Sequence, residues 1–265
     1  MLEEKYAELI KIIESHDSVA VAFSGGVDST FLLSVAHDVL GENVLAITAS
    51  SPLIPRNEIM EAEAFCKSNN IRQITFSYEI EKEPQIRLNP KDRCYHCKKS
   101  IFTKMKSIAL ETGIDILLDG SNVDDTSDYR PGMKALKELR IVSPLKDAGL
   151  TKEDIRKLSK KLNLPTWDKP SYACLATRIP VGDEITREKL SIIEKSEEVL
   201  HEKGFLKSRV RLHNNLARIE ISPEQFEEIM KPEIRDDITV RLKQIGFDYV
   251  SLDMQGYRMG SMNEK

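Results

Sequence analysis

The chain has 265 residues, enough for one large or two medium domains. Its 39 Lys and Arg residues against 43 Asp and Glu residues give a formal net charge of -4, which argues against a surface that coats nucleic acid or an anionic membrane. The first stretch, MLEEKYAELIKIIESH, has no apolar run long enough for a signal peptide or a membrane span. We therefore expect a cytoplasmic protein with neither nucleic acid nor a membrane as its partner.

Short apolar runs alternate with helical patterns in the first half of the chain. The expected strands cover residues 18–23, 43–48, 72–78, 115–120 and 140–145. The expected helices include residues 31–39, 55–69, 98–112 and 151–163. This alternation predicts an α/β fold, in which a parallel sheet is covered by helices on both faces. Ligands bind such sheets beyond the carboxyl ends of the strands.

Residues 164–185 have no periodic pattern and contain three prolines, which is typical of a functional loop or a linker. Beyond them the pattern changes. We expect a helix at 186–203, two strands that turn at Asn214-Asn215, helical segments within 223–245 and a last strand near 249–254. These patterns predict a domain of residues 1–180 and a smaller α+β domain of residues 181–265.

The stretch AFSGGVDST at 22–30 lies between the first strand and the first helix. Gly25 and Gly26 let the backbone approach a ligand closely, Ser24 and Ser29 offer hydroxyl groups, and the amides of the helix N-terminus attract an anion. Asp28 would repel a bare phosphate, which is consistent with a Mg²⁺ ion between the two. The spacing matches neither a Walker loop nor a dinucleotide fingerprint. A serine-rich helix cap is the alternative interpretation.

The four cysteines favour thiols, metal ligands or redox groups over a disulfide framework, because the chain shows no secretion signal. Cys66 follows Phe65 in a helical pattern, so we expect a small residue of the core. Cys94 and Cys97, in RCYHCKK, can chelate a metal or cluster or form a redox dithiol. Together with Cys174 they would supply three ligands to a four-iron cluster and leave its fourth iron open. The alternative is a CxxC motif that serves structure or redox chemistry alone.

The sequence SGGVDS resembles the signature of the PP-loop ATP pyrophosphatases, a group that includes GMP synthetase, NAD synthetase and tRNA-thiolating enzymes. The resemblance implies an adenine nucleotide alpha hydrolase-like domain that cleaves ATP between its α and β phosphates and adenylates a substrate oxygen. The residues that it implies for nucleotide binding are Ser24, Gly25, Gly26, Asp28, Ser29, Thr48, Ser50, Gly120 and Asp124. For Asp124 and its neighbour Asp125, a helix cap is the alternative role.

Five motifs together, SGGVDST, RCYHCK, DGSNVDD, PSYACLATRIP and GYRMGSMN, resemble the LarE family of ATP-dependent sulfur transferases over nearly the whole chain. That family acts in the synthesis of the nickel-pincer nucleotide cofactor of lactate racemase. It adenylates the carboxylates of pyridinium-3,5-biscarboxylic acid mononucleotide, with release of AMP and pyrophosphate, and replaces an oxygen by sulfur in each.

One branch of this family sacrifices a cysteine at the position that matches Cys174 and leaves dehydroalanine there. Another branch relays external sulfide, or sulfur from another donor, through a [4Fe-4S] cluster on a cysteine triad. Because this chain has Cys94 and Cys97 besides Cys174, it resembles the cluster branch. The resemblance implies ATP, Mg²⁺ and a [4Fe-4S] cluster as cofactors, and Asp28 and Cys174 as catalytic residues.

The run SRVRLH places Arg209, Arg211 and His213 on one face of a strand. A row of cations is often simply a solvated face, but two arginines can also clamp the phosphate of a mononucleotide. Arg258, in GYRMGS, could join them. In the LarE family this domain supports oligomerisation, with anion-binding arginines at subunit contacts, so the resemblance implies a homo-oligomer.

Two other functions remain open on the sequence. An amidotransferase-like synthetase would deliver ammonia to the adenylated substrate, although the chain has no glutaminase domain and the CxxC motif would then have no purpose. A non-catalytic sensor of nucleotide and metal would use the same fold and bind ATP without releasing pyrophosphate.

Overall fold

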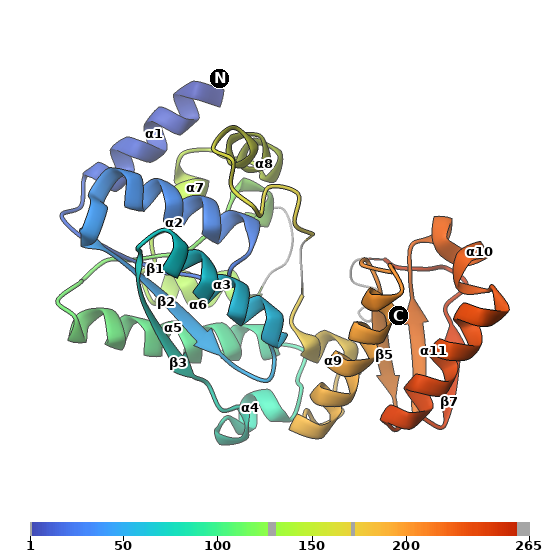
Figure 1. Cartoon of the computed structure of the whole chain (residues 1–265). Helices are drawn as coiled ribbons and strands as arrows, with labels where there is room; N and C mark the ends of the chain where they lie inside the picture. The colour runs from blue at the N-terminus through green and yellow to red at the C-terminus, as the bar shows by residue number, and fades with distance from the viewer. Residues whose placement is uncertain (1, 127–130, 171–172, 259–265) are drawn as a thin grey trace. The chain divides into compact units, whose positions relative to one another are not determined.

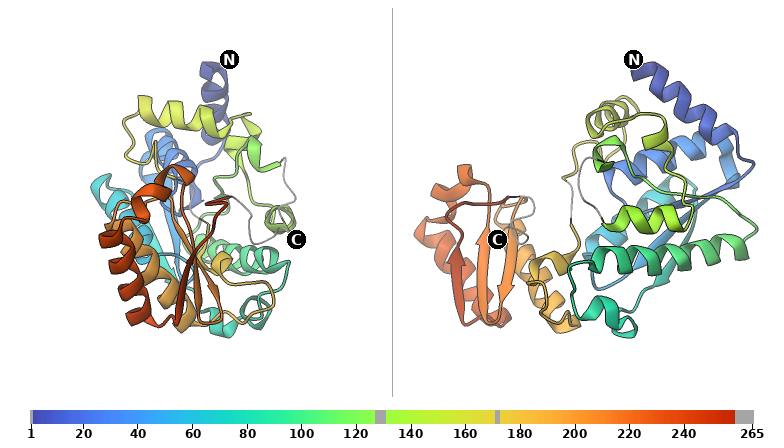
Figure 2. Two further views of the ribbon diagram at one scale, coloured as in Figure 1. Left: turned by 90° about the vertical axis from the view of Figure 1, so that its right-hand side faces the viewer. Right: turned by 180° about the vertical axis from the view of Figure 1, so that it is seen from behind.

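The structure, a computed structural model, describes residues 2–126, 131–170 and 173–258. The chain forms two compact units, each with its own sheet (Figures 1 and 2). Residues 1–79 and 92–172 make up the first unit, and residues 80–91 and 173–265 make up the second. Among the described residues, no helix is long and apolar enough to cross a membrane.

The sheet of the first unit consists of parallel strands in the order β3-β2-β1-β4. Their bounds are Val19–Ala22 for β1, Val44–Ser50 for β2, Arg72–Ser77 for β3 and Leu117–Leu118 for β4. The register pairs Val19 with Val44 and Leu45 with Arg72, so the carboxyl ends of β1, β2 and β3 lie at one edge. The predicted parallel α/β sheet is confirmed.

Helices cover both faces of this sheet, as α2 and α5 show in Figure 1. The helix bounds are Leu2–Glu14 for α1, Val27–Leu40 for α2, Arg56–Ser68 for α3, Arg93–Glu111 for α5, Pro131–Glu138 for α6, Pro144–Asp147 for α7 and Lys152–Lys161 for α8. Successive residues of a strand point to opposite faces. Val19 and Val21 therefore pack in the core with α1, α2, α3 and α8, whereas Ala20 packs with α5 and α6. Both faces of β1 are dry, which accounts for its purely apolar sequence.

The prediction of a strand at 140–145 is wrong. In the structure Val142 forms only an isolated parallel bridge with Leu118, and Pro144 then begins α7. Proline has no amide for a ladder hydrogen bond and is well suited to the first turn of a helix, so the strand cannot continue. The patterns also missed α1, which packs its buried Leu9 and Ile13 into the same core as α2.

The second unit contains a three-stranded sheet in the order β5-β6-β7. Strands β5 (Arg209–His213) and β6 (Leu216–Glu220) form the predicted hairpin, in which Asn214 takes a positive φ of 53°. Strand β7 (Tyr249–Leu252) pairs with β6 in parallel. Helix α9 (Arg187–Glu202) packs against β5, and α11 (Pro232–Ile245) packs against β7 and α9. Two short helices, α4 (Pro84–Arg87) and α10 (Phe226–Ile229), complete the unit.

Helix α11 begins only at Pro232, so the helical pattern over 223–245 is divided into a 3-10 turn at Pro223–Gln225, the short α10, and α11. Other 3-10 turns lie at Gly41–Asn43, Ile80–Lys82, Val123–Thr126 and Leu175–Arg178 (η4). Residues from 259 on, which include the end of the GYRMGSMN motif, and Ser171 and Tyr172 lie outside the described residues.

The division into units differs in two respects from the boundary expected near residue 180. The second unit already begins at Ala173, and it includes residues 80–91. Asn89 accounts for the second difference, because its buried side-chain amide donates to the carbonyls of Ile179 and Pro180 at 3.2 and 2.7 Å. The carbonyl of Arg87 also accepts from the amide of Ile185 at 2.8 Å. A sequence pattern cannot reveal such long-range pairing.

Candidate functional site

The loop between β1 and α2 brings its backbone close to neighbouring elements at two glycines. Gly25 has a φ of 71°, and a Cβ there would lie 3.2 Å from Cβ of Ala62 and 3.3 Å from the carbonyl oxygen of Glu58. Gly120, after β4, approaches the first turn of α2, since a Cβ there would lie 3.1 Å from the amide nitrogen of Ser29. Only glycine suits these contacts, so the loop backbone is held in a fixed shape.

The two predicted serines of this loop contact each other. Their hydroxyl oxygens lie 3.0 Å apart, and the Ser29 hydroxyl donates to the carbonyl of Gly26 at 3.2 Å. The amide of Gly26 lies 3.4 Å from the Ser24 hydroxyl. Gly26 is also the N-cap residue of α2, where no side chain caps the helix. Amides and hydroxyls gathered at the N-terminus of a 14-residue helix form an arrangement that suits a phosphate group.

Asp28, in the first turn of α2, lies opposite a lysine that the sequence analysis missed. The Lys152 ammonium group donates to its Oδ2, and the side-chain amide of Asn122 donates to its Oδ1 at 3.4 Å. Burial raises the pKa of Asp28, the Lys152 charge opposes this shift, and the charge of Asp125 adds to it. Asp28 thus carries a partly desolvated carboxylate that needs a cation, and Lys152 supplies one in this structure.

The acidic residues that follow β4 have mainly structural partners. A carboxylate oxygen of Asp124 accepts from the backbone amide of Lys152, the first residue of α8, at 2.8 Å. Asp125 accepts from the amide of Asn122 at 3.0 Å. Asp119, which is buried directly after β4, accepts from the hydroxyls of Ser121 and Ser143. These contacts favour the capping interpretation for Asp124, which satisfies an amide at the start of α8.

Thr48 and Ser50 lie near the carboxyl end of β2. The buried Thr48 hydroxyl donates to the carbonyl of Phe23 at 2.9 Å and accepts from the side chain of Gln73 at 2.8 Å. The Thr48 hydroxyl therefore links β1, β2 and β3, and both of its hydrogen bonds are made within the sheet. Ser50 is partly exposed, and its carbonyl accepts from the amide of Tyr78 at 2.7 Å.

Lys169 is a second lysine of this site that the sequence analysis missed. Its ammonium group lies 3.2 Å from the carbonyl oxygen of Gly25, 2.8 Å from Glu58 and 2.7 Å from Glu61. Burial would lower the pKa of Lys169, but the hydrogen bonds to the two carboxylates outweigh it and raise the pKa. The backbone of Lys169 is fixed in turn, because Arg156 donates to its carbonyl at 2.7 Å. Lys169 thus holds the backbone of segment 22–30, which we call the phosphate loop, at the carbonyl of Gly25.

The CxxC motif lies in the first turns of α5, which begins at Arg93 and so before the helix expected at 98–112. Cys94 is exposed and Cys97 partly buried, and neither forms a disulfide. Cys66 differs from them as expected, because it is only 1% exposed in the core against α2, and burial raises the pKa of its thiol to about 12. Burial thus excludes Cys66 as a metal ligand, whereas Cys94 and Cys97 remain the predicted ligands.

Cys174 belongs to the second unit, directly before η4. Its thiol is outside any disulfide and partly buried, and its carbonyl accepts from the amide and hydroxyl of Thr177 at 3.0 and 2.9 Å. Cys94 and Cys97 belong to the first unit. Within the parts of the chain that the structure describes, no group of three or more His, Cys, Asp or Glu side chains could hold a metal ion. The three-cysteine cluster therefore stays a prediction.

Arg209 and Arg211 on β5 are both buried, so the interpretation as a solvated face is wrong. Arg211 pairs with the fully buried Glu220 at 2.7 Å and donates to the carbonyl of Thr177 at 3.0 Å. The Arg209 guanidinium lies 5.1 Å from the ring centroid of Tyr257. Burial lowers the pKa of Arg209, and the nearby positive charge of Arg178 acts in the same direction. Arg258 is partly exposed and donates to the side chain of Gln255.

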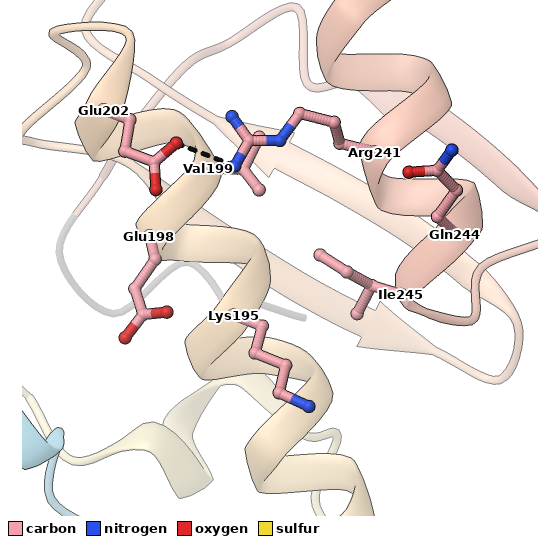
Figure 3. Close-up of a pocket in the computed structure, with 7 residues that line it drawn as sticks. All are labelled: Lys195, Glu198, Val199, Glu202, Arg241, Gln244 and Ile245. Atoms are coloured by element: carbon pink, nitrogen blue, oxygen red, sulfur yellow. Dashed lines mark ion pairs between the residues drawn. The ribbon is translucent and has the colours of Figure 1, made fainter.

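The second unit also has a cavity of about 280 Å³ between α9 and α11. Figure 3 shows its lining, in which Glu202 of α9 and Arg241 of α11 form an ion pair at 2.7 Å. The other lining residues are Lys195, Glu198, Val199, Gln244 and Ile245. None of the predicted site residues is among them, so this cavity is separate from the residues that carry the candidate chemistry.

Comparisons with known proteins find relatives that match nearly the whole chain. No family model matches it. It is 40% identical over 263 residues to an uncharacterised protein from Synechocystis, with 99% of this chain and 98% of the relative covered. It is 35% identical over 266 residues to the pyridinium-3,5-bisthiocarboxylic acid mononucleotide synthase from Lactiplantibacillus plantarum, with 99% and 95% covered. One subunit of a glutamine-hydrolysing GMP synthase from Methanothermobacter thermautotrophicus is 24% identical over 210 residues, with 75% and 68% covered.

Proposed function

Because the chain belongs to the LarE family, the pyridinium-3,5-bisthiocarboxylic acid mononucleotide synthases among the PP-loop ATP pyrophosphatases, we propose that it transfers sulfur to a pyridinium mononucleotide in an ATP-dependent reaction. Its substrate would be pyridinium-3,5-biscarboxylic acid mononucleotide, in the synthesis of the nickel-pincer nucleotide. The observation that carries the proposal is the phosphate loop, with its fixed glycine backbone, its paired serine hydroxyls and Asp28 beside it.

In the first half-reaction, a carboxylate oxygen of the substrate attacks the α-phosphorus of ATP. The bond between the α-phosphorus and the bridging oxygen to the β-phosphorus breaks, pyrophosphate leaves, and an acyl adenylate forms. Amides at the start of α2, together with Ser24 and Ser29, would hold the pyrophosphate. The carboxylate of Asp28 suits Mg²⁺, which would neutralise phosphate charge. Lys152 would then be free to turn from Asp28 toward the phosphates.

In the second half-reaction, sulfide attacks the carbonyl carbon of the acyl adenylate, a C–S bond forms, the C–O bond to the phosphate of AMP breaks, and AMP leaves with one oxygen of the substrate. The exposed Cys94, together with Cys97 and Cys174, would hold a [4Fe-4S] cluster, which supplies a site for external sulfide when bound. The fit rests on thiol accessibility, because none of the three cysteines forms a disulfide and none lies in the core, in contrast to Cys66. Sacrifice of the Cys174 sulfur is the competing route for the same step.

Arg209 and Arg211, with Arg258, would bind the phosphate of the mononucleotide. Two guanidinium groups lie on one face of β5, and Arg211 would keep its pair with Glu220 while both arginines contact the phosphate. Burial and the positive charge of Arg178 both lower the pKa of Arg209, and a bound phosphate would offset that positive charge. We further propose that the protein is a homo-oligomer and that this phosphate site lies near a subunit contact, as the resemblance implies.

The test is to incubate anaerobically reconstituted protein with ATP, Mg²⁺, sulfide and the dicarboxylate mononucleotide, and to measure AMP and thiocarboxylate. The proposal predicts AMP and a sulfur-containing product, both dependent on sulfide. AMP formation with ammonia in place of sulfide would instead indicate a synthetase that delivers ammonia. ATP binding without release of pyrophosphate would indicate a sensor.

A further inference from the structure

Arg178 lies at the centre of a buried charge network in the second unit. Its side chain is 1% exposed, at the end of the η4 turn that follows Cys174. Its Nε and Nη2 donate to the two carboxylate oxygens of Glu197 at 2.9 and 2.8 Å. A bidentate pair of this kind fixes both the position and the plane of the guanidinium group.

The remaining nitrogen of Arg178 is directed at the backbone around Cys174. Nη1 donates to the carbonyl of Ala173 at 2.7 Å, to the carbonyl of Cys174 at 3.2 Å and to the hydroxyl of Thr177 at 2.9 Å. All three partners lie within residues 173–177. A single planar guanidinium therefore holds the carbonyls of the two peptide groups that flank the Cα of Cys174, while the thiol itself is outside any disulfide.

The same network continues to β5. A carboxylate oxygen of Glu197 also accepts from the amide of Val210 at 3.0 Å, between the two arginines that we propose for phosphate binding. From the other side, Arg211 donates to the carbonyl of Thr177. The Cys174 segment is thus tied to β5 through two independent links.

The network also keeps Arg178 charged. Burial alone would lower the pKa of Arg178, but the charge and hydrogen bonds of Glu197 outweigh it and raise the pKa. A permanently charged donor in a dry site gives stronger and more rigid hydrogen bonds than a neutral one would.

We propose that Arg178 is a positioning residue for sulfur transfer, which fixes the Cys174 backbone, and so the thiol, relative to the arginines of β5. The inference rests on the proposed function, in which Cys174 takes part in sulfur transfer and β5 binds the substrate phosphate. Arg178 acts through Cys174 and does not itself contact the reacting atoms. A misplacement of about 1 Å at a reacting group can lower a rate about 100-fold.

Three variants separate this role from a general effect on folding. In Arg178→Lys the charge remains, but one ammonium group cannot span both Glu197 and the carbonyls of residues 173 and 174. In the double variant Arg178→Met with Glu197→Gln, the buried pair is removed as a whole, so that no unpaired charge is left in the interior, and the new side-chain amide can still accept from Val210. Arg156→Met is the matched control, because Arg156 also donates to two backbone carbonyls, those of Trp167 and Lys169 in the first unit.

The first measurement is amide hydrogen exchange of residues 173–179 in the whole protein. In the double variant we expect these amides to exchange at least about tenfold faster than in the wild type, because the charged hydrogen bonds of Arg178 are lost. In Arg178→Lys we expect an intermediate rate. The second measurement is steady-state sulfur transfer. We expect kcat to fall about 100-fold in the double variant, with KM for ATP unchanged, and a partial recovery in Arg178→Lys. Arg156→Met should leave exchange of 173–179 at the wild-type rate.

Wild-type exchange of 173–179 together with wild-type kcat in the double variant would overturn the inference. Faster exchange with wild-type kcat would also overturn it, because the segment would then be held without any consequence for sulfur transfer. Failure of the proposed function has a different signature, since Cys174→Ala would then form product at the wild-type rate whatever the exchange measurements show.

Discussion

The Lys152 ammonium group is hydrogen-bonded to the Asp28 carboxylate, although the two residues lie 124 positions apart in the sequence. The contact places a protein cation where a metal-bound nucleotide is expected to need the carboxylate. Because Asp124 also accepts from the amide of Lys152, the start of α8 is held beside the phosphate loop. Lys152 therefore joins the start of α8 to the first turn of α2, and it would have to leave Asp28 if Mg²⁺ bound there.

Replacement of Asp28 by Asn should separate stability from activity. Burial raises the pKa of Asp28, so the native state binds a proton more readily than the unfolded chain does. The contribution of Asp28 to stability therefore falls as the pH rises from its unfolded pKa of 3.8 through the raised folded pKa. At pH 7 the neutral Asn side chain removes the free-energy cost of a buried carboxylate. We expect the thermal midpoint of Asp28→Asn to be no lower than that of the wild type, while pyrophosphate release is lost. A clearly lower midpoint would contradict the assigned cause of the pKa shift.

Substitution of Gly25 should have two effects, one from backbone strain and one from close packing, and a second glycine with a similar φ can separate them. In Gly25→Ala the positive φ costs about 1 kcal/mol or more of conformational energy, and the new methyl group would lie 3.2 Å from Cβ of Ala62. We expect both lower stability and weaker ATP binding, measured by calorimetry. Gly113 has a similar φ of 81° but nothing within 4 Å of its added Cβ, so Gly113→Ala should lose stability alone. Equal ATP affinities in the two variants would contradict a role for close packing at Gly25.

Lys169 should influence ATP binding through Gly25. In Lys169→Met the carbonyl of Gly25 loses its donor and the buried Glu58 loses its partner, which should cost about 1–3 kcal/mol of unfolding free energy. KM for ATP should rise as the loop loosens. Lys157, whose ion pair with Glu153 is exposed, provides the control, and Lys157→Met should leave the free energy of unfolding close to the wild-type value. An unchanged KM for ATP in Lys169→Met would show that the loop does not depend on this contact.

The cysteines should differ sharply in their reaction with an alkylating reagent. Burial raises the pKa of Cys66 to about 12, so at a pH of about 8 its thiol is protonated as well as inaccessible in the folded protein. Cys94 is exposed and should react first. Mass spectrometry of peptides after brief treatment of cluster-free protein with iodoacetamide measures each rate. Labelling of Cys66 as rapid as that of Cys94 would mean that α3 does not hold it in the core.

The sequence predicted the parts of the site that depend on local patterns. The apolar run of β1, the glycines after it and the start of α2 follow from neighbouring residues, and so does the hairpin at Asn214. The role of Lys169 could not be predicted, because its partners Gly25 and Glu58 are distant in sequence and its own segment has no periodic pattern.

Alternation along a strand likewise shows which residues share a face but not what covers that face. Arg209 and Arg211 were correctly grouped, yet only the structure shows that they are buried and that Arg211 contacts Glu220 and Thr177. The bidentate pair of Arg178 and Glu197 could not be predicted either, because it joins the η4 turn to α9 and no periodic pattern relates the two residues.

In the proposed reaction the transferred sulfur comes from external sulfide and Cys174 keeps its own sulfur atom, so the intact mass of the protein after turnover is the decisive measurement. Anaerobic protein would be incubated with ATP, Mg²⁺, sulfide and the dicarboxylate mononucleotide, then stripped of any cluster and weighed by mass spectrometry. We predict thiocarboxylate product together with a polypeptide of unchanged mass. A polypeptide lighter by one H₂S, with dehydroalanine at position 174, would contradict relay of external sulfide and show that Cys174 is the sulfur donor.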